Sequence, residues 1–446
     1  MLRWILLCIC VIGCLIHPAS ARAGDKDAIA RGKKALENRA FTPSSWTADA
    51  YENAWQHWQP KLDKAPANYD QAFRNQYGLH AAPFANGRYP MGLRPGADGK
   101  GLAFDCLACH GGSILGKSVV GLGNQALDLQ ALFEDMNAAS GRAGKLPFAV
   151  ANVRGTNEAF GMTVALLALR NPDLSLREKP QQLELYDDMC EDVPAWWHLR
   201  KKKTIYHTGS TNSRSVRTLM QFMLNPANPL AAFEKEEAVF GDIQAYLLSL
   251  TSPKYPFPIA EKVAVQGRDL FGNRCAKCHG TYGSNGKYPN KIVAHDIIAT
   301  DAKRLRGLSP KVVGFYNETW FAQEKPAGFK ASDAEGYQAP PLDGVWATAP
   351  YLHNGSVPTL YDVLNSKTRP KLFTRSFATD EAAYDKTKVG WKVKILTERP
   401  ETTLPAIERR KVYDTTQPGR GNGGHTFGDD LNENERWAII EYLKTL

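Results

Sequence analysis

One five-residue pattern that occurs twice constrains this chain more than any other feature. The pattern Cys-x-x-Cys-His stands at Cys106, Cys109 and His110 and again at Cys275, Cys278 and His279. Two thiols three residues apart lie on one helical turn and can reach the two vinyl groups of one porphyrin, while the adjacent histidine can bind the iron. A thioredoxin-like pair or half of a zinc site would not need the histidine in both copies. The sequence therefore predicts two covalently attached c-type haems.

The beginning of the chain is typical of an export signal. Arg3 precedes an apolar run, residues 4–16, and the small-residue pattern Ala21-Arg-Ala23 follows. We expect residues 1–23 to be a signal peptide and the mature chain to begin near Gly24. A competing interpretation is lipoprotein processing at Cys14, within a lipobox-like Val-Ile-Gly-Cys. Export agrees with haem attachment outside the cytoplasm and predicts a periplasmic or secreted protein.

Composition and hydropathy exclude two broad classes. The formal net charge of +9 falls to +7 when Arg3 and Arg22 leave with the signal, which does not argue for a nucleic-acid partner. After the signal, no stretch approaches the roughly 20 apolar residues that a transmembrane helix needs. Outside the two motifs the mature chain has only Cys190, which is most simply a buried apolar residue.

The two halves of the chain have a similar organisation. Each half ends in an amphipathic helical pattern of the form x-Tyr-Leu-x-x-Leu, at residues 245–250 and 441–446. Between the halves, residues 251–259 contain Pro253, Pro256 and Pro258, which indicate an extended linker. We expect haem domains at residues 24–250 and 260–446. Because strand signals are weak, the predicted fold class is mainly α, with two tandem cytochrome-c-like domains and long irregular loops.

The second half contains no methionine, so its iron cannot take a methionine from its own domain as sixth ligand. The histidine candidates there are His295, His353 and His425. His425 is the first choice because it lies in a glycine-rich loop, residues 419–428, just before the closing helix, and glycines let the backbone approach a flat porphyrin. A solvent-exposed loop histidine is the alternative. Two histidine ligands would leave no open coordination position on the second iron, which is typical of a haem that relays electrons.

The first half lacks a comparable glycine-histidine loop before its closing helix. An open sixth position on the first iron is therefore expected. His80, His198, His207 and the methionines of that half remain alternative ligands.

A second motif carries a family resemblance. The segment Ala339-Pro-Pro-Leu-Asp-Gly-Val-Trp-Ala-Thr-Ala-Pro-Tyr-Leu-His-Asn-Gly-Ser-Val-Pro-Thr-Leu360, with two haem motifs in this order, resembles the bacterial di-haem cytochrome c peroxidase and MauG superfamily. Within it, the likeness is closest to the rubber oxygenase (RoxA-like) branch. The resemblance implies an N-terminal haem that meets peroxide or dioxygen and a C-terminal haem that passes electrons. It also implies that His425 holds an axial ligand position.

The resemblance assigns roles to further residues. It implies that Trp196 or Trp197 bridges the two haems; the alternative is that both are core aromatics. It implies that His353 and Tyr351 hold haem propionates at the domain interface; the alternative is a turn stabilised by Asn354 and Gly355. The lysine run 201–203 is either a solvated face or a source of propionate contacts.

One departure from the family affects the expected chemistry. Typical peroxidases of this family place a glutamate shortly after the bridging tryptophan, whereas the matching stretch here, residues 206–217, has none. Glu158 could supply the missing carboxylate and Arg154 could bind a propionate, but a helix-capping role for the segment around Glu158 is the simpler interpretation. This departure favours an oxygenase-like oxidative role over peroxidase activity.

Two functions are thus predicted from the sequence. The first is a haem-dependent oxidoreductase, of peroxidase or oxygenase type, that activates peroxide or dioxygen at the haem on His110. Its partner would be a small electron-donor protein or an organic substrate. The second is a di-haem electron-transfer cytochrome without catalysis. Calcium between the domains, as in some relatives, is left open.

Overall fold

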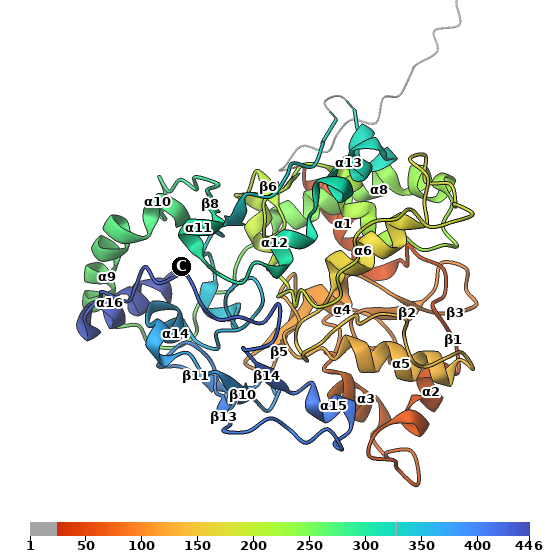
Figure 1. The fold of residues 1–446 in the computed structure, drawn as a ribbon, viewed down its shortest axis with the longest axis horizontal. Coiled ribbons are helices and arrows are strands. Elements are labelled where there is room, and N and C mark those ends of the chain that lie inside the picture. The colour runs from red at the N-terminus through yellow and green to blue at the C-terminus, as the bar shows by residue number, and fades with distance from the viewer. Residues whose placement is uncertain (1–24, 326–327) are drawn as a thin grey trace, which may run out of the picture.

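A computed structural model describes residues 25–325 and 328–446 (Figure 1). Its α-helices are α1 (Lys26–Asn38), α2 (Ala50–Asn53), α3 (Tyr69–Tyr77), α4 (Leu107–His110), α5 (Leu129–Ala139), α6 (Ala159–Ala168), α7 (Val216–Leu219), α8 (Leu230–Ser249), α9 (Glu261–Arg274), α10 (Ala276–His279), α11 (His295–Ile298), α12 (Lys303–Gly307), α13 (Pro310–Glu318), α14 (Leu360–Leu364), α15 (Ala406–Arg409) and α16 (Glu433–Leu443). Short 3-10 helices are η1 (Ala54–His57), η2 (Trp196–Arg200), η3 (Met220–Met223), η4 (Trp320–Gln323), η5 (Val345–Ala347) and η6 (Ser366–Thr368).

The strands are short and pair antiparallel in small sheets and hairpins. Three-stranded sheets join β1 (Trp46–Thr47), β3 (Gly101–Phe104) and β2 (Leu93–Pro95), and β13 (Lys394–Ile395), β10 (Leu372–Thr374) and β14 (Val412–Asp414). Two-stranded pairs join β4 (Gly111–Ile114) with β5 (Lys117–Val120), β6 (Thr204–Ile205) with β7 (Thr211–Asn212), β8 (Ile292–Ala294) with β9 (Gly336–Gln338), and β11 (Tyr384–Asp385) with β12 (Gly390–Trp391).

The fold is mixed, with 37% helix and 11% strand, where the sequence had predicted a mainly α class. The difference lies in strands of two to four residues. Such strands are too short to show the alternation of apolar and polar residues from which a strand is predicted. The longer helices, by contrast, carry a readable pattern.

The first and last helices of each half pack against each other. In the first half α1 lies on α8, and in the second α9 lies on α16. Both contacts are close at a glycine: a Cβ on Gly32 would lie 1.9 Å from the carbonyl oxygen of Asp242, and a Cβ on Gly267 would lie 1.8 Å from that of Ala438. Only glycine allows backbones to approach so closely. The same helix pair is thus built twice.

The two halves also exchange core residues. Trp197, from the first half, is buried in the hydrophobic cluster of the second half with Trp346 and Trp391. In return, Phe315 of α13 and Phe321 of η4 pack into the cluster of the first half. The hydrophobic cores therefore interlock, and the division into residues 24–250 and 260–446 stays a prediction.

Residues 251–260, which join the halves, contain no helix or strand. The predicted signal peptide, residues 1–23, lies outside the described residues. Among the helices that the structure describes, none combines the length and the apolar character needed to cross a membrane.

Candidate haem-binding site

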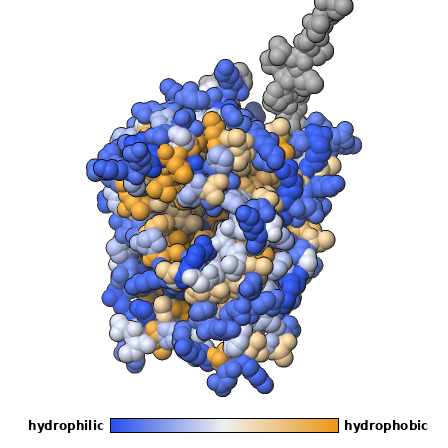
Figure 2. Space-filling view, turned by 90° about the vertical axis from the view of Figure 1, so that its right-hand side faces the viewer, coloured by the Kyte–Doolittle hydropathy of each residue, from blue (hydrophilic) through white to orange (hydrophobic). Residues whose placement is uncertain are grey.

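A cavity of about 880 Å³ reaches both Cys-x-x-Cys-His motifs. This volume is at the upper end of the roughly 300–1,000 Å³ usual for ligand pockets. Near the first motif the wall is largely aromatic and apolar, and Figure 2 shows apolar side chains gathered around a hollow on one face of the molecule. The lining residues there include Phe104, Phe133, Phe148, Met162 and Phe222. A large, flat, apolar ligand suits such a wall.

The first motif is presented by a hairpin and one helical turn. Cys106 caps α4, so its thiol and that of Cys109 lie within one turn, and both line the cavity. Burial raises the pKa of Cys109 to about 12. Burial also lowers the pKa of His110 to about 4, so its imidazole is neutral at pH 7 and retains the lone pair that a metal ligand needs.

Trp196 is the aromatic partner of His110. Their rings are stacked, with centroids 4.4 Å apart and planes inclined by 19°. The stack is fixed by the backbone: Gly121 donates to the carbonyl of His110 at 2.7 Å, and Trp196 donates to the carbonyl of Gly121 at 2.8 Å. The hairpin β4–β5 returns the chain to Gly121, and this return sets the position of Trp196.

The second motif faces His425 across the cavity. The rings of His279 and His425 have centroids 6.2 Å apart at an angle of 61°. Two imidazoles bound to opposite sides of one metal ion at about 2.0 Å have centroids roughly 6 Å apart. His279 Nδ1 donates to the carbonyl of Pro340 at 2.9 Å, which leaves its Nε2 lone pair free. Burial lowers the pKa of His425 to about 4, so it too is neutral.

The loop that carries His425 is held by buried polar side chains. Arg369 donates to the carbonyls of Asn422 and Gly424, each at 2.7 Å, and to that of His425 at 3.1 Å. Asn354, fully buried, donates to the carbonyls of Gly419 at 3.1 Å and Gly421 at 2.9 Å. The His-Asn-Gly-Ser segment, which carries the family resemblance, thus braces this loop.

The segment Trp196–His198 connects the two motifs. Trp197 Nε1 and His198 Nε2 both donate to the carbonyl of Asp343, at 2.7 and 2.9 Å. Asp343 lies three residues after Pro340, the residue that orients His279. Trp196 therefore contacts the first motif, while its neighbour reaches the segment that supports the second.

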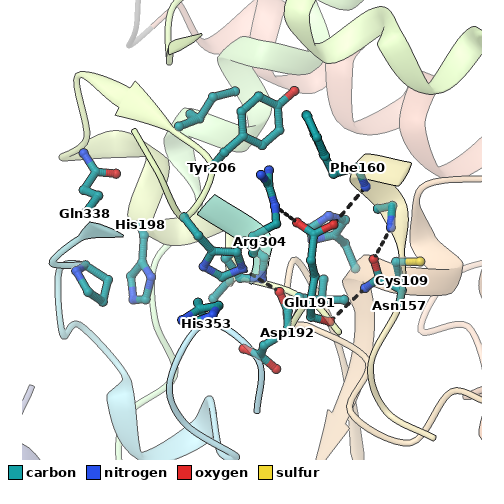
Figure 3. Close-up of a pocket in the computed structure, with 18 of the residues that line it drawn as sticks. Cys109, Asn157, Phe160, Glu191, Asp192, His198, Tyr206, Arg304, Gln338 and His353 are labelled. Atoms are coloured by element: carbon teal, nitrogen blue, oxygen red, sulfur yellow. Dashed lines mark hydrogen bonds and ion pairs between the residues drawn. The ribbon is translucent and has the colours of Figure 1, made fainter. Parts of the chain in front are cut away.

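Figure 3 shows a polar wall of the same cavity. Glu191 and Arg304 form a buried ion pair, and Glu191 also accepts from the backbone N–H of Phe160 at 2.9 Å. His207 Nε2 donates to the carbonyl of Asp192 at 2.9 Å. Burial raises the pKa of the Asp192 carboxyl well above its usual range.

His353 belongs to the same wall. Its ring is stacked on Tyr337, with centroids 4.0 Å apart, and lies 6.1 Å from the ring of His207. Burial lowers the pKa of His353 well below its ordinary value, so the ring is neutral. Tyr351 also lines the cavity, but its hydroxyl donates to the carbonyls of Val345 and Val389. Cofactor contact by these two residues stays a prediction.

Of the predicted catalytic residues, Trp196 lines the cavity, whereas Trp197 and Glu158 do not. The carboxylate of Glu158 accepts from the backbone N–H groups of Met189 and Cys190, at 2.8 and 3.0 Å, and from Asn152 at 3.0 Å. This arrangement favours the structural interpretation of Glu158. Glu191 and Asp192, which do line the cavity, were missed by sequence reasoning. Their position five and four residues before Trp196 was the available signal.

Few of the alternative ligands for the first iron are free. His80 donates to Asn124, and the Nε2 atoms of His198 and His207 are bonded to backbone carbonyls. Within the described residues, no histidine ring pairs with His110 as His425 pairs with His279. Met162 lines the cavity and is therefore the methionine to consider as a ligand of the first iron.

These features fit a c-type haem. Thiols of both motifs line the cavity, the proximal histidines are neutral, and His425 Nδ1 is a buried atom with no hydrogen-bond partner among the described residues. Calcium is a separate matter. In residues 25–325 and 328–446 no group of three or more His, Cys, Asp or Glu side chains could hold a metal ion, and calcium stays a prediction.

Comparison with known proteins gives a family match at the segment that braces His425. Residues 336–374 match the family described as "RoxA-like, cytochrome c-like". Two relatives from Sinorhizobium fredii are uncharacterized proteins. The first, y4iM, is 28% identical over 293 residues, which cover 57% of this chain and 64% of y4iM. The second, y4iJ, is 27% identical over 267 residues, which cover 44% of this chain and 41% of y4iJ. Each match spans less than two thirds of the relative.

Two solved structures are similar at a coarse level. Hydrazine synthase of Kuenenia stuttgartiensis is 14% identical, with a TM-score of 0.24, over 64% of this chain and 87% of that chain. A MauG-like protein associated with microbial copper homeostasis is 16% identical, with a TM-score of 0.28, over 68% and 94%. The family match falls on the segment that holds the loop facing His279, in a chain with two Cys-x-x-Cys-His motifs. The chain is therefore similar, over residues 336–374, to the RoxA-like, cytochrome c-like family.

Proposed function

We propose that this chain binds two c-type haems and oxidises a substrate with peroxide or dioxygen at the haem on His110. His279 and His425 would hold the second haem, which would supply electron exchange with the first. A haem on His110 supplies a redox-active iron with a coordination position for the oxidant. The remaining steps depend on the side chains around it.

The asymmetry between the two proximal histidines carries the proposal. His279 faces a second neutral imidazole at 6.2 Å, whereas His110 is stacked on an indole that cannot bind iron. Two histidine ligands close both axial positions of an iron, and one leaves a position open. If one haem relays electrons and the other reacts with the oxidant, the two irons need different environments.

The chain's own residues prepare the first site in three ways. Phe133, Phe148 and Phe222 exclude water from the cavity and offer an apolar surface to an organic substrate. Trp196 holds the plane of His110 by stacking. Trp197 and His198 connect this segment to Asp343, next to the support of His279, and so shorten the route for electrons.

The carboxyl groups of the cavity favour oxygenase over peroxidase chemistry. Glu191 is held in an ion pair with Arg304, so its carboxylate is not a free base. Burial raises the pKa of the Asp192 carboxyl well above its usual range. Peroxide cleavage in the family relies on a carboxylate that shuttles protons.

One spectrum tests the proposal. The purified protein should contain two covalent haems per chain, and its oxidised form should show one high-spin and one low-spin iron. Cyanide or peroxide should change the high-spin signal alone. Two low-spin irons whose spectra change with neither cyanide nor peroxide would refute the proposal. Turnover of reduced cytochrome c with peroxide, measured in parallel, would select peroxidase over oxygenase chemistry.

A second function, electron transfer without catalysis, is favoured by one observation. Met162, on α6, lines the cavity near the first motif, and a thioether can fill the sixth position of a c-type haem. In that case the wild-type protein would be low-spin at both irons. Met162→Leu would then create a high-spin iron, whereas under the first proposal it leaves the spin states unchanged.

The cell compartment and the partner are proposals of the same kind. A signal peptide at residues 1–23 and haem attachment outside the cytoplasm support a periplasmic or secreted protein. The partner is a small electron-donor protein or an organic molecule, and the apolar cavity wall supports the organic molecule. Mass spectrometry of the protein purified from its source would show whether residues 1–23 have been removed.

A further inference from the structure

The structure divides the lysine run 201–203 into three different environments. Lys201 forms an ion pair with Asp343 at 2.7 Å, and Lys203 is exposed to solvent. Lys202, between them, is only 8% exposed and lines the cavity that contains both haem motifs. Three neighbouring residues of one type therefore differ in what surrounds their charge.

The ammonium group of Lys202 has no counter-charge. Among the described residues it forms neither a hydrogen bond nor an ion pair, and burial alone accounts for a pKa lowered to about 8. Even at that value the group is mostly charged at pH 7. Its backbone is fixed, because Ser213 Oγ donates to the carbonyl of Lys202 at 2.5 Å. Lys202 is thus a buried cation on a rigid support.

The charged neighbours do not neutralise Lys202. Glu191, an acidic residue of the same wall, is paired with Arg304. Asp192, whose pKa is raised by burial, forms no ion pair with Lys202, and burial is the sole cause of the lowered Lys202 pKa. His198 and His207, the nearby imidazoles, have pKa values lowered to about 4 and are neutral. Among the described residues, the polar wall therefore offers the Lys202 ammonium no paired carboxylate.

A buried charge without a partner is costly, and proteins pair such charges or place them next to an ion or ligand of opposite sign. The missing anion must enter the cavity, because the protein wall supplies none. The ligand that the cavity is built for carries anions of its own, since a haem has two propionate carboxylates. A compact ammonium on a flexible stem can meet a carboxylate as a point charge.

We propose that Lys202 is a propionate anchor, whose Nζ forms an ion pair with a carboxylate of a haem bound in this cavity. The assignment rests on the proposed function, since it requires haem to be bound. Lys202 is a positioning residue that also sets a redox potential. A positive charge close to a haem favours the reduced iron, which carries one positive charge less than the oxidised iron.

The adjacent lysine provides a matched control for the test. Lys202→Met removes the charge and keeps an apolar chain of similar length, Lys202→Arg keeps the charge, and Lys203→Met removes the neighbouring exposed charge. All three are made in the full-length chain and compared for haem content and for both reduction potentials by spectroelectrochemistry.

We expect Lys202→Met to lower one reduction potential by a tenfold change in the reduction equilibrium, which is 59 mV for one electron. Lys202→Arg should restore most of the difference, and Lys203→Met should leave both potentials unchanged. If Lys202→Met does not fold, Lys202→Gln replaces it. Unchanged potentials in a fully loaded neutral variant would overturn the assignment.

A soluble carboxylate is the alternative anion for the ion pair with Lys202. Acetate is the probe for this alternative. If acetate changes the spectrum of the wild-type protein but not that of Lys202→Met, and the potentials of the two agree, then Lys202 binds a soluble anion and not a propionate. If the wild-type protein holds no haem, the proposed function fails, and the two failures are thereby distinguished.

Discussion

Trp196 lies against His110 with ring centroids 4.4 Å apart and nearly parallel planes. The indole is 8% exposed and shares its hydrophobic cluster with helices of the first half, while Trp197 is buried in the cluster of the second half. Two successive residues thus belong to two different cores. This pair therefore connects the hydrophobic clusters that surround the two haem motifs.

Replacement of Trp196 tests that role. Trp196→Phe keeps an aromatic ring but reduces the overlap with His110, so we expect a loss of about 1 kcal/mol in the free energy of unfolding. We also expect slower electron exchange between the two haems, measured by stopped-flow absorption after partial reduction. Trp437→Phe, in a ring pair with Tyr361 on the second half, is the control and should leave the exchange rate unchanged. Equal rates in both variants would exclude Trp196 from the route.

His425 should determine the spin state of the second iron. His425→Ala removes the imidazole that faces His279, so the oxidised protein should gain a second high-spin signal in its absorption and EPR spectra. His425→Met should restore a low-spin iron with a raised potential, because methionine ligation raises the potential of c-type haem. His295→Ala is the control, since His295 Nε2 is already bonded to the carbonyl of Thr300. A low-spin second iron in His425→Ala would contradict the assignment.

Arg369 should stabilise the loop that presents His425. Its guanidinium donates to five backbone carbonyls, those of Asp362, Val363, Asn422, Gly424 and His425. Because unsatisfied buried carbonyls cost about 1–3 kcal/mol each, Arg369→Gln should lower the free energy of unfolding by about 3–5 kcal/mol.

The same variant should also loosen the ligand. A mobile loop lets His425 leave the iron part of the time, so the spectrum should show a mixture of spin states. Arg399→Gln breaks an ion pair of a more exposed arginine with Asp414 and should change stability by less than about 1 kcal/mol. A stable, purely low-spin Arg369→Gln variant would show that the position of His425 does not depend on Arg369.

Glu158 should make stability depend on pH. Burial raises its pKa to about 7, against 4.5 for the free side chain, although three hydrogen-bond donors act in the opposite direction. The folded protein therefore holds a proton that the unfolded chain has lost between these two values. The contribution of Glu158 to stability is therefore fully present below pH 4.5 and is lost as pH rises through about 7, by about 3 kcal/mol.

Glu158→Gln removes this titration, so urea unfolding between pH 5 and 7 should show a flatter dependence than in the wild-type protein. Glu178→Gln, at an exposed position, should retain the wild-type slope. A structural role also predicts that Glu158→Gln leaves the pH profile of turnover unchanged. A shifted turnover profile would return Glu158 to the catalytic residues that the sequence suggested.

The sequence alone determined the features that depend on neighbouring residues. Haem attachment needs two thiols and a histidine within one helical turn, so Cys106, Cys109 and His110 are recognisable without a structure. A closing helix was predicted directly after the glycine-rich loop of His425, and it begins at Glu433 after the cap of Asn432. Short strands were missed, since two to four residues give no usable period.

Only the tertiary structure decided which distant residues meet. In the sequence, Glu158 was the candidate carboxylate and Glu191 was missed, while Lys201, Lys202 and Lys203 formed one run. Folding placed Glu191 and Lys202 on the cavity wall and left Glu158 bonded to backbone N–H groups. Burial and charge pairing arise from contacts between segments far apart along the chain. Local sequence patterns carry no record of such contacts.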